Sequence, residues 1–428
     1  MTSRGKQNPH GGGRIVPLEH FQESGNRFSD KKFGKNKELE RGFDSIKTRS
    51  ALDTLRVWDI AVRLFHWSLV LLVAAAAYTG FLGPEWQLGM HVLAGYGIGL
   101  LILFRVIWGF AGSRYARFAS FLFSPRELAS HIQGILRGKS ERYIGHNPAG
   151  ALMVFALLIV LAALTVSGLI VLGGQENQGM LAAFSSYKSG QIARNIHELL
   201  GFLLLAMIGA HLAGVVLESA LSRENLVRAM ITGRKHAKTG RAADLADESR
   251  VVWRAPVIFA LISLIAGLTY WVLANRPASG FTVMKRRAVW ASECGDCHYA
   301  YHPSLLPRSS WRRIMAGLDE HFGEDASLDE ETAARITSFL TTYASEEWDS
   351  EAANELRKTD AQKPLEITAT PYWKQRHARI DPEIFRRKMI GSKANCIACH
   401  KDAANGRFAD EEITIPDKHK PNNKGEKK

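Results

Sequence analysis

Five long apolar stretches constrain the fold of this chain more than any other feature of its sequence. Each is close to the twenty or so residues that an α-helix needs to cross the hydrocarbon core of a bilayer. They cover roughly residues 60–82, 90–110, 149–172, 195–217 and 255–274. The third and fifth contain no charged residue, which argues against buried helices of a soluble domain. We therefore expect five transmembrane helices.

The Lys and Arg residues between these stretches alternate from one connecting segment to the next. There are twelve in residues 1–59, none in 83–89, six in 111–148, two in 173–194 and eight in 218–254. Because segments rich in Lys and Arg stay in the cytoplasm, the pattern predicts a cytoplasmic N-terminus and a C-terminal region on the outer side. Basic residues directly after the fifth stretch oppose the pattern locally, but long soluble domains cross the membrane largely regardless of charge.

Changes in composition divide the chain into six parts. We expect a polar, basic cytoplasmic tail (1–56), a four-helix membrane bundle (57–220), a basic cytoplasmic loop (221–254), a fifth membrane helix (255–275), an outer domain (276–416) and a Lys-rich disordered tail (417–428). Much of the formal net charge of +13 lies in segments that flank the apolar stretches, where it sets orientation. We therefore expect no nucleic-acid partner.

Four histidines lie within the predicted spans, where polar side chains are costly and need a reason. The topology places His66 and His211 near the inner side, and His91 and His197 near the outer side. His197 and His211 are fourteen residues apart, so they share a helix face and lie roughly 21 Å apart along the axis. Two stacked pairs of facing imidazoles predict two non-covalent b haems. The alternative, scattered structural histidines, does not predict matched depths.

Two arginines and one further histidine lie near the predicted inner side. Arg63 and Arg105 are candidates for contacts with haem propionates or a quinone oxygen, and the alternative of snorkelling side chains at helix ends stays open. His146 precedes the third span, and we interpret it as a loop residue beside a helix start.

All four cysteines belong to two Cys-x-x-Cys-His motifs, Cys294–His298 and Cys396–His400. Two thiols at this spacing can each form a thioether with one vinyl group of a porphyrin, and the adjacent histidine becomes the proximal ligand. The motifs predict two covalent c haems, attached through Cys294, Cys297, Cys396 and Cys399, with His298 and His400 as axial ligands. A zinc site or two disulfides would not explain the histidine after each pair. Bacteria attach c haems outside the inner membrane, in agreement with the loop charges.

The membrane part resembles the bacterial cytochrome b561 and nickel–iron hydrogenase b-subunit family. The resembling segments are Val57-Trp58-Asp59, Arg63 to Trp67, Met90-His91, Arg105 to Gly109, His146 to Gly150, His197-Glu198 and His211. The resemblance implies two b haems and exchange of electrons with quinone.

Residues 288–416 resemble the dihaem cytochrome c family. The resembling segments are both Cys-x-x-Cys-His motifs, Leu306-Pro307, Ser310-Trp311, Met315 to Leu318, His321 to Gly323, Trp373 with His377, and Asn395. Each c haem needs a distal ligand, and the resemblance favours His321 and His377 over His302 or Met315. His419 lies in the Lys-rich tail and is discounted. We prefer His321 at the first haem and His377 at the second, although the sequence does not decide the pairing.

Local patterns also predict secondary structure in this outer domain. We expect a helix over Ser309–Phe322, a capping box at Ser327 that opens a helix to about Tyr343, and an N-cap at Asp381. Residues 346–371 have the composition of a polar connector.

Together these features predict an all-α protein of the bacterial inner membrane. It combines a transmembrane four-helix haem bundle, a fifth anchoring transmembrane helix and a small, mostly helical dihaem cytochrome c domain in the periplasm. The expected function is electron transfer between exchangeable quinone and a soluble periplasmic cytochrome or redox enzyme, with quinol oxidation as the preferred direction. The alternatives are delivery from a periplasmic dehydrogenase or hydrogenase to quinone, a haem enzyme acting on oxygen or superoxide, and a purely structural anchor. A quinol:cytochrome c-type oxidoreductase activity and a homo-oligomeric state are left open.

Overall fold

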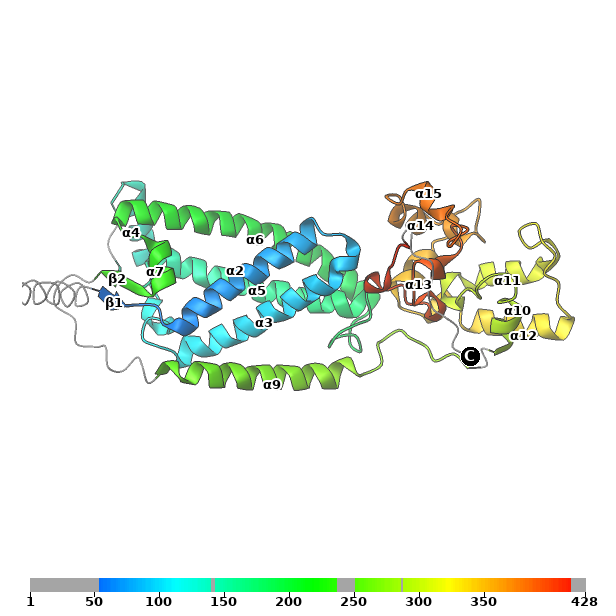
Figure 1. Ribbon diagram of the computed structural model, residues 1–428, viewed down its shortest axis with the longest axis horizontal. Coiled ribbons are helices and arrows are strands. Elements are labelled where there is room, and N and C mark those ends of the chain that lie inside the picture. The colour runs from blue at the N-terminus through cyan, green and yellow to red at the C-terminus, as the bar shows by residue number, and fades with distance from the viewer. Residues whose placement is uncertain (1–53, 140–142, 237–250, 286–287, 417–428) are drawn as a thin grey trace, which may run out of the picture.

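The structure, a computed structural model, describes residues 54–139, 143–236, 251–285 and 288–416. Its regular structure is almost entirely helical, which confirms the predicted all-α fold. The molecule is elongated, with the long apolar helices in one half and the C-terminal domain in the other (Figure 1). The predicted tails lie outside the described residues, apart from Thr54–Arg56 in the N-terminal one.

Within the described residues, five helices are long and apolar enough to cross a membrane, and they match the five predicted spans. They are α2 (Ile60–Phe81), α3 (Leu88–Ala111), α5 (Pro148–Gly174), α6 (Tyr187–Ser222) and α9 (Arg254–Ala274). Helices α2 and α3 pack against each other, α3 packs against α5, and α5 packs against α6. Helix α9 lies on the outside of this bundle against α3, as expected for an anchoring helix.

A single buried carboxylate fixes the start of α2 against the end of α3. The Asp59 side chain accepts a hydrogen bond from the Val62 backbone N–H at 2.7 Å, which caps the first turn of α2. Its other oxygen accepts from Trp108 Nε1 at 3.0 Å and from Ser113 Oγ at 2.6 Å. These bonds satisfy a buried charge and set the register of the two helices at one end of the bundle.

Helix α6 begins eight residues before the predicted fourth span. The Ser186 side chain caps its first turn by accepting a hydrogen bond from Ser189 N. The added turns carry Lys188, Gln191 and Arg194, which a hydropathy pattern excludes but which favour a helix once it is capped. The helix therefore extends beyond the apolar layer, and His197 lies about three turns inside it.

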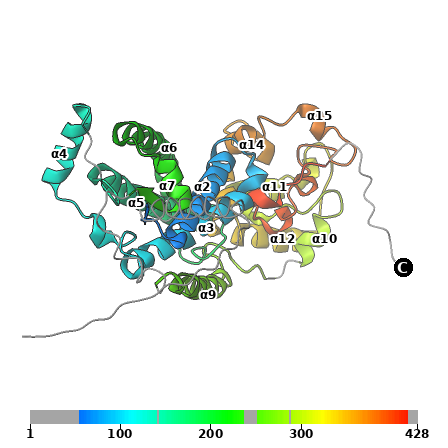
Figure 2. The same cartoon turned by 60° about the vertical axis from the view of Figure 1, so that its left-hand side comes forward.

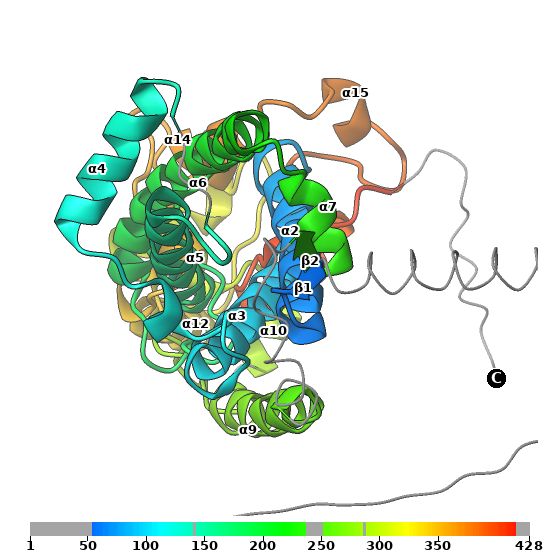
Figure 3. The ribbon, with the colours of Figure 1, turned by 90° about the vertical axis from the view of Figure 1, so that its left-hand side faces the viewer.

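The loops on the predicted cytoplasmic side contain more regular structure than the sequence indicated. Helix α4 (Pro125–Leu136) starts at a capping box between Ser124 and Glu127, and it stands outside the bundle (Figures 2 and 3). Strand β1 (Thr54–Arg56) pairs antiparallel with β2 (Arg234–His236), just after α7 (Leu226–Thr232). The predicted polar tail and basic loop thus meet at the same end of the bundle.

The outer domain is built from short helices around two small apolar cores. The helices are α10 (Ala288–Glu293), α11 (Arg308–Ala316), α12 (Glu330–Thr342), α13 (Glu351–Leu356), α14 (Pro371–Arg376) and α15 (Pro382–Phe385). Helices α10, α11 and α12 share one core at the far end of the molecule, whereas α13 lies next to the bundle (Figure 1). The predicted N-cap at Asp381 is confirmed, since its side chain accepts from Glu383 N at 3.0 Å.

Three local predictions in this domain need correction. The helix predicted over Ser309–Phe322 ends at Ala316, because the chain turns at Gly317 and reaches a positive φ of 53° at Phe322. Helix α12 is capped by Asp329 rather than by Ser327, since the Asp329 carboxylate accepts from Thr332 N at 2.9 Å. The predicted connector 346–371 contains α13, which Ser350 caps.

Candidate haem sites

The structure brings the rings of His91 on α3 and His197 on α6 close together. Their ring centroids are 6.0 Å apart and their planes are tilted by 72°. A metal bound by one nitrogen of each ring at about 2 Å, along one line, would separate the centroids by roughly 6 Å. The pair therefore has the spacing of a bis-imidazole site near one end of the bundle.

The same small motif supports each of these two imidazoles. Thr79-Gly80 on α2 lies beside His91, with Thr79 Oγ1 3.2 Å from His91 Nδ1. Ser167-Gly168 on α5 lies beside His197, with Ser167 Oγ 3.1 Å from His197 Nδ1. Both hydroxyls donate to carbonyl oxygens of their own helices, so each accepts from the Nδ1–H of its histidine. This tautomer leaves Nε2 of each ring free to bind a metal.

The two glycines provide the space that these imidazoles need. A Cβ atom at Gly80 would lie 3.1 Å from His91 Cε1, and one at Gly168 would lie 3.1 Å from His197 Cε1. The sequence analysis missed this pair of supports. The repeated signal was a hydroxyl residue followed by glycine, once in the first span and once in the third.

His66 of α2 and His211 of α6 lie close enough for their charges to interact. The His66 ring lies edge-on to Trp67, at a centroid distance of 5.1 Å. Its Nδ1 is buried and has no hydrogen-bond partner within the part of the chain that the structure describes. This pair is thus less tightly supported by protein groups than the outer one.

Arg105 and His146 lie at the predicted inner end of the bundle, where Arg105 is buried and His146, in the loop before α5 as predicted, is half-buried. Arg105 is only 3% exposed, and its guanidinium lies 4.8 Å above the Phe118 ring, so it does not snorkel to water. The His146 ring is held between Trp58 and Phe121, at centroid distances of 4.6 and 4.4 Å. Burial and the positive charges of Arg105 and Lys235 lower the pKa of His146 to about 3. His146 is therefore neutral.

Arg63 lies at the same end, next to the turn that follows α7. A Cβ atom at Gly233 would lie 3.2 Å from Arg63 Cδ, which shows how closely the side chain passes the turn. Arg63 Nε is buried without a hydrogen-bond partner among the described residues, and the same is true of Arg105 Nη1. Two cationic side chains with unused donors are the groups that an anionic or carbonyl ligand would engage.

The outer domain contains two further histidine pairs, each joining one Cys-x-x-Cys-His motif to one predicted distal residue. The rings of His298 and His321 are 6.2 Å apart and tilted by 24°. Those of His377 and His400 are 6.1 Å apart and tilted by 66°. The Nδ1 atoms of His298 and His377 each lie 2.8 Å from a backbone carbonyl, which leaves the opposite nitrogen free. The geometry matches the preferred assignment of the distal residues.

Among the described residues, no disulfide joins the four cysteines, and no three His, Cys, Asp or Glu side chains are grouped as in a zinc site. His302 is 1% exposed and bonds Ser304 at 2.8 Å, so it belongs to the core of the domain. Met315 packs into the apolar core of α11 and α12.

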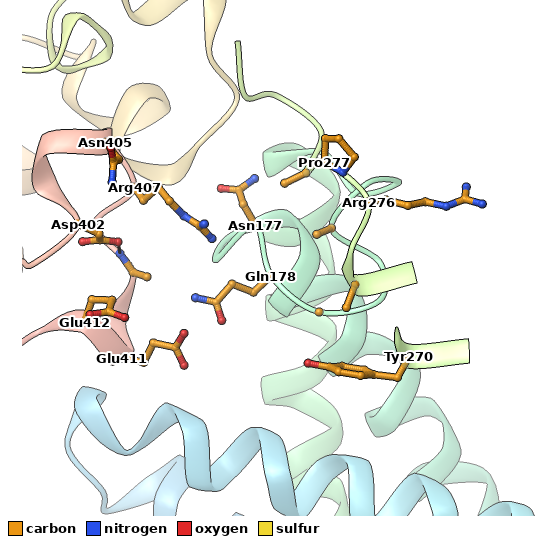
Figure 4. A pocket seen from close by; sticks show the side chains of 15 residues that line it. Asn177, Gln178, Tyr270, Arg276, Pro277, Asp402, Asn405, Arg407, Glu411 and Glu412 are labelled. Atoms are coloured by element: carbon orange, nitrogen blue, oxygen red, sulfur yellow. Dashed lines mark hydrogen bonds between the residues drawn. The ribbon is translucent and has the colours of Figure 1, made fainter. Parts of the chain in front are cut away.

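A polar cavity of about 580 Å³ separates part of the outer domain from the bundle. The loop after α5 contributes Asn177 and Gln178, and the end of α9 contributes Tyr270 (Figure 4). Arg407 and Glu411 face them from the outer domain. None of the predicted haem ligands lines this cavity, so the histidine pairs are separate from it.

Two family models match the two halves of the chain. The model for prokaryotic cytochrome b561 matches residues 57–233, and the model for dihaem cytochrome c matches residues 290–408. The chain belongs to both families. It is a cytochrome b561 domain joined to a dihaem cytochrome c domain.

Individual relatives resemble one half or the other of this b561–dihaem fusion. The probable Ni/Fe-hydrogenase B-type cytochrome subunit of Azotobacter chroococcum is 26% identical, and the match covers 48% of this chain and 98% of the relative. The corresponding subunit of Escherichia coli hydrogenase 1 is 24% identical, over 44% and 93%. The dihaem cytochrome c of Rhodobacter sphaeroides is 38% identical, over 30% of this chain and all of that one, with a TM-score of 0.26. The dihaem cytochrome from Shewanella baltica is 32% identical, over 31% and 94%, with a TM-score of 0.26.

These findings establish the class of the fusion protein. It is an integral membrane cytochrome that binds haem b through one domain and haem c through the other, and it transfers electrons. The spacing of three histidine pairs and the free nitrogen on their rings fit such cofactors.

Proposed function

We propose that the protein carries electrons between quinone and a periplasmic redox partner, and that it oxidises quinol. The observation that carries this proposal is the succession of histidine pairs along one elongated chain. Pairs on α2, α3 and α6 occupy the membrane bundle, and two pairs occupy the outer domain. One-electron chemistry would be supplied by the haem irons.

We assign the axial positions from the pairing of the rings. His66 and His211 would hold the inner b haem, and His91 with His197 the outer one. His298 with His321 would hold the first c haem, and His400 with His377 the second. Cys294, Cys297, Cys396 and Cys399 would form the thioethers.

The inner end of the bundle is the favoured place for quinone or for haem propionates. Arg63 and Arg105 carry buried donors without partners in the described chain, and neutral His146 lies next to Arg105. Such donors match the carbonyl oxygens of a quinone as well as carboxylates. The loop charges support a cytoplasmic position for this end, in the inner membrane, and a periplasmic position for the outer domain.

Delivery of electrons to quinone from an outer enzyme is the second candidate. It is favoured by the relatives of the bundle, which are described as Ni/Fe-hydrogenase B-type cytochrome subunits. Chemistry on oxygen or superoxide is less favoured, because three histidine pairs already have the spacing that fills both axial positions of an iron.

Rapid mixing of membranes with a soluble quinol analogue tests the proposal. We expect b-haem absorbance to appear first and c-haem absorbance to follow in the same membranes. A different outcome would be that quinol reduces neither cofactor, whereas an added donor reduces the c haems and these electrons then reach quinone. In that case the direction of electron flow would be the reverse of the proposed one. Absence of exchange with quinone in both directions would contradict the proposal.

A further inference from the structure

Arg376 joins the outer domain to the bundle directly beside a proposed haem ligand. It is the last residue of α14 and immediately precedes His377. Its Nη2 lies 2.8 Å from Asp410 Oδ1 within the outer domain, and its Nη1 lies 3.3 Å from Glu85 Oε1 on the bundle. Glu85 opens the short turn η1 (Glu85–Gln87) that leads into α3, six residues before His91. One guanidinium therefore connects the surroundings of two proposed haem sites.

Further polar contacts join the bundle to α13, to the turn Asp410–Glu412 and to Ser279, which follows α9. The Asp410 backbone N–H donates to Glu176 Oε2 at 3.3 Å. Tyr187 at the start of α6 donates its backbone N–H to Asp349 at 3.0 Å and its hydroxyl to Glu355 at 2.8 Å. Helices α10 to α12, which surround the first motif, lie at the far end of the molecule (Figure 1).

The charges at this junction make Arg376 hard to replace. Three carboxylates act on it, Glu85, Glu351 and Asp410. Removing this guanidinium would leave their like charges facing each other, which costs more than the pair itself contributes. The polar cavity next to the turn Asp410–Glu412 limits apolar contact on that side (Figure 4). The junction thus depends on its ionic contacts.

We propose that Arg376 is the positioning residue that seats the second Cys-x-x-Cys-His motif against the outer end of the bundle. The second motif, and not the first, then receives electrons from the bundle, so the spatial order of the two c sites reverses their order in the sequence. The first motif directly follows α10 at the far end of the molecule, where a soluble partner has access (Figure 1). This inference rests on the proposed electron transfer between bundle and outer domain.

Arg376→Gln in the full-length protein, assayed in membranes, tests it. Reduction of the c haems by quinol should slow on the order of tenfold, because the reacting groups are no longer held in place. The b haems should be reduced at the original rate, and dithionite should still reduce the c haems completely. The midpoint potential of the second c haem should fall, since a positive charge next to it is lost, while that of the first stays constant. Electron paramagnetic resonance can separate the two haems, because their ligand planes are tilted differently.

Two further variants keep the result unambiguous. Glu85→Gln removes the bundle side of the same ion pair without touching the outer domain, so it should slow c-haem reduction as well. Arg308→Gln breaks a comparable ion pair at the far end, 2.8 Å from Glu347, and should change neither rate nor potential. Normal c-haem reduction in both Arg376→Gln and Glu85→Gln would overturn the inference, and so would an equal shift of both midpoints. Either result would leave quinol oxidation by the unmodified protein intact, so the two proposals fail separately.

Discussion

At the scale of single residues, the most specific feature is the hydroxyl group behind each outer imidazole. Ser167 and Thr79 accept a hydrogen bond from Nδ1–H and thereby fix the tautomer that points Nε2 at a metal. Each imidazole also has a backbone acceptor, the Ala76 carbonyl at 3.0 Å for His91 and the Leu164 carbonyl for His197. Loss of either hydroxyl should therefore have a similar effect.

We expect Ser167→Ala to raise the midpoint potential of the outer b haem. An imidazole that donates from Nδ1 is a more basic ligand and stabilises the oxidised iron, so losing the acceptor favours the reduced form. A potentiometric titration of membranes measures the shift, and Thr79→Val should give a comparable one. Ser263→Ala is the matched control, since Ser263 bonds its own helix at Phe259 O on α9, which carries none of the proposed ligands. An unchanged or lowered potential in Ser167→Ala would contradict this role.

The angles between paired rings predict the magnetic signature of each site. Imidazole planes 72° apart at His91 and His197 should give the highly anisotropic low-spin signal of near-perpendicular ligands. Planes only 24° apart at His298 and His321 should give an ordinary rhombic signal. Low-temperature spectra of the oxidised protein test both assignments. Indistinguishable signals from the outer b haem and the first c haem would show that the paired imidazole rings are arranged differently.

At the scale of elements, hydropathy located all five membrane helices, because each must be apolar over the width of a bilayer. It missed the start of α6, where Ser186 caps a polar extension that lies beyond the apolar layer. The pairing of histidines by depth followed from the topology that the loop charges predict and from the rise of a helix. In the outer domain, the end of the helix before Gly317 and the short α13 were not predicted, because one glycine or one capped turn is a weak local signal.

The contact between η9 (Asp410–Glu412) and the loop after α5 should depend on pH. Burial, with the nearby carboxylates of Asp410 and Glu351, raises the pKa of Glu176 to about 8, and Arg376 opposes the shift. A raised pKa means that docking favours the protonated acid. Its contribution is complete below the ordinary carboxyl range and is lost as the pH rises through the raised pKa.

We therefore expect transfer from the b haems to the c haems to slow as the pH rises from the ordinary carboxyl range to about 8. Glu176→Gln should remove this dependence, because an amide stays neutral. Stopped-flow absorbance at several pH values measures the effect. Glu347→Gln, at the far end of the outer domain, should keep the pH profile of the unmodified protein. A profile that is the same in Glu176→Gln and the unmodified protein would rule out Glu176 as the titrating group.

At the scale of the whole molecule, the sequence predicted the two domains and their cofactors but not how they meet. Each Cys-x-x-Cys-His motif is a local pattern, so its chemistry can be read without a fold. The pairs Arg376–Glu85 and Asp410–Glu176 join residues more than two hundred positions apart, and no local pattern marks them. The proposed order of the c sites relative to the membrane likewise depends on tertiary packing, and so does the enclosure of His146 between Trp58 and Phe121.

The most direct test of the account is the His197→Ala variant, mixed with quinol in membranes. As a proposed ligand of the outer b haem, His197 would lie on the path between the bundle and the outer domain. We expect the variant to lose this haem and to keep both c haems attached and fully reducible by dithionite. Quinol should reduce these c haems much more slowly. Reduction of the c haems by quinol at the original rate in this variant would contradict the account, because the outer b site would then not lie on the path.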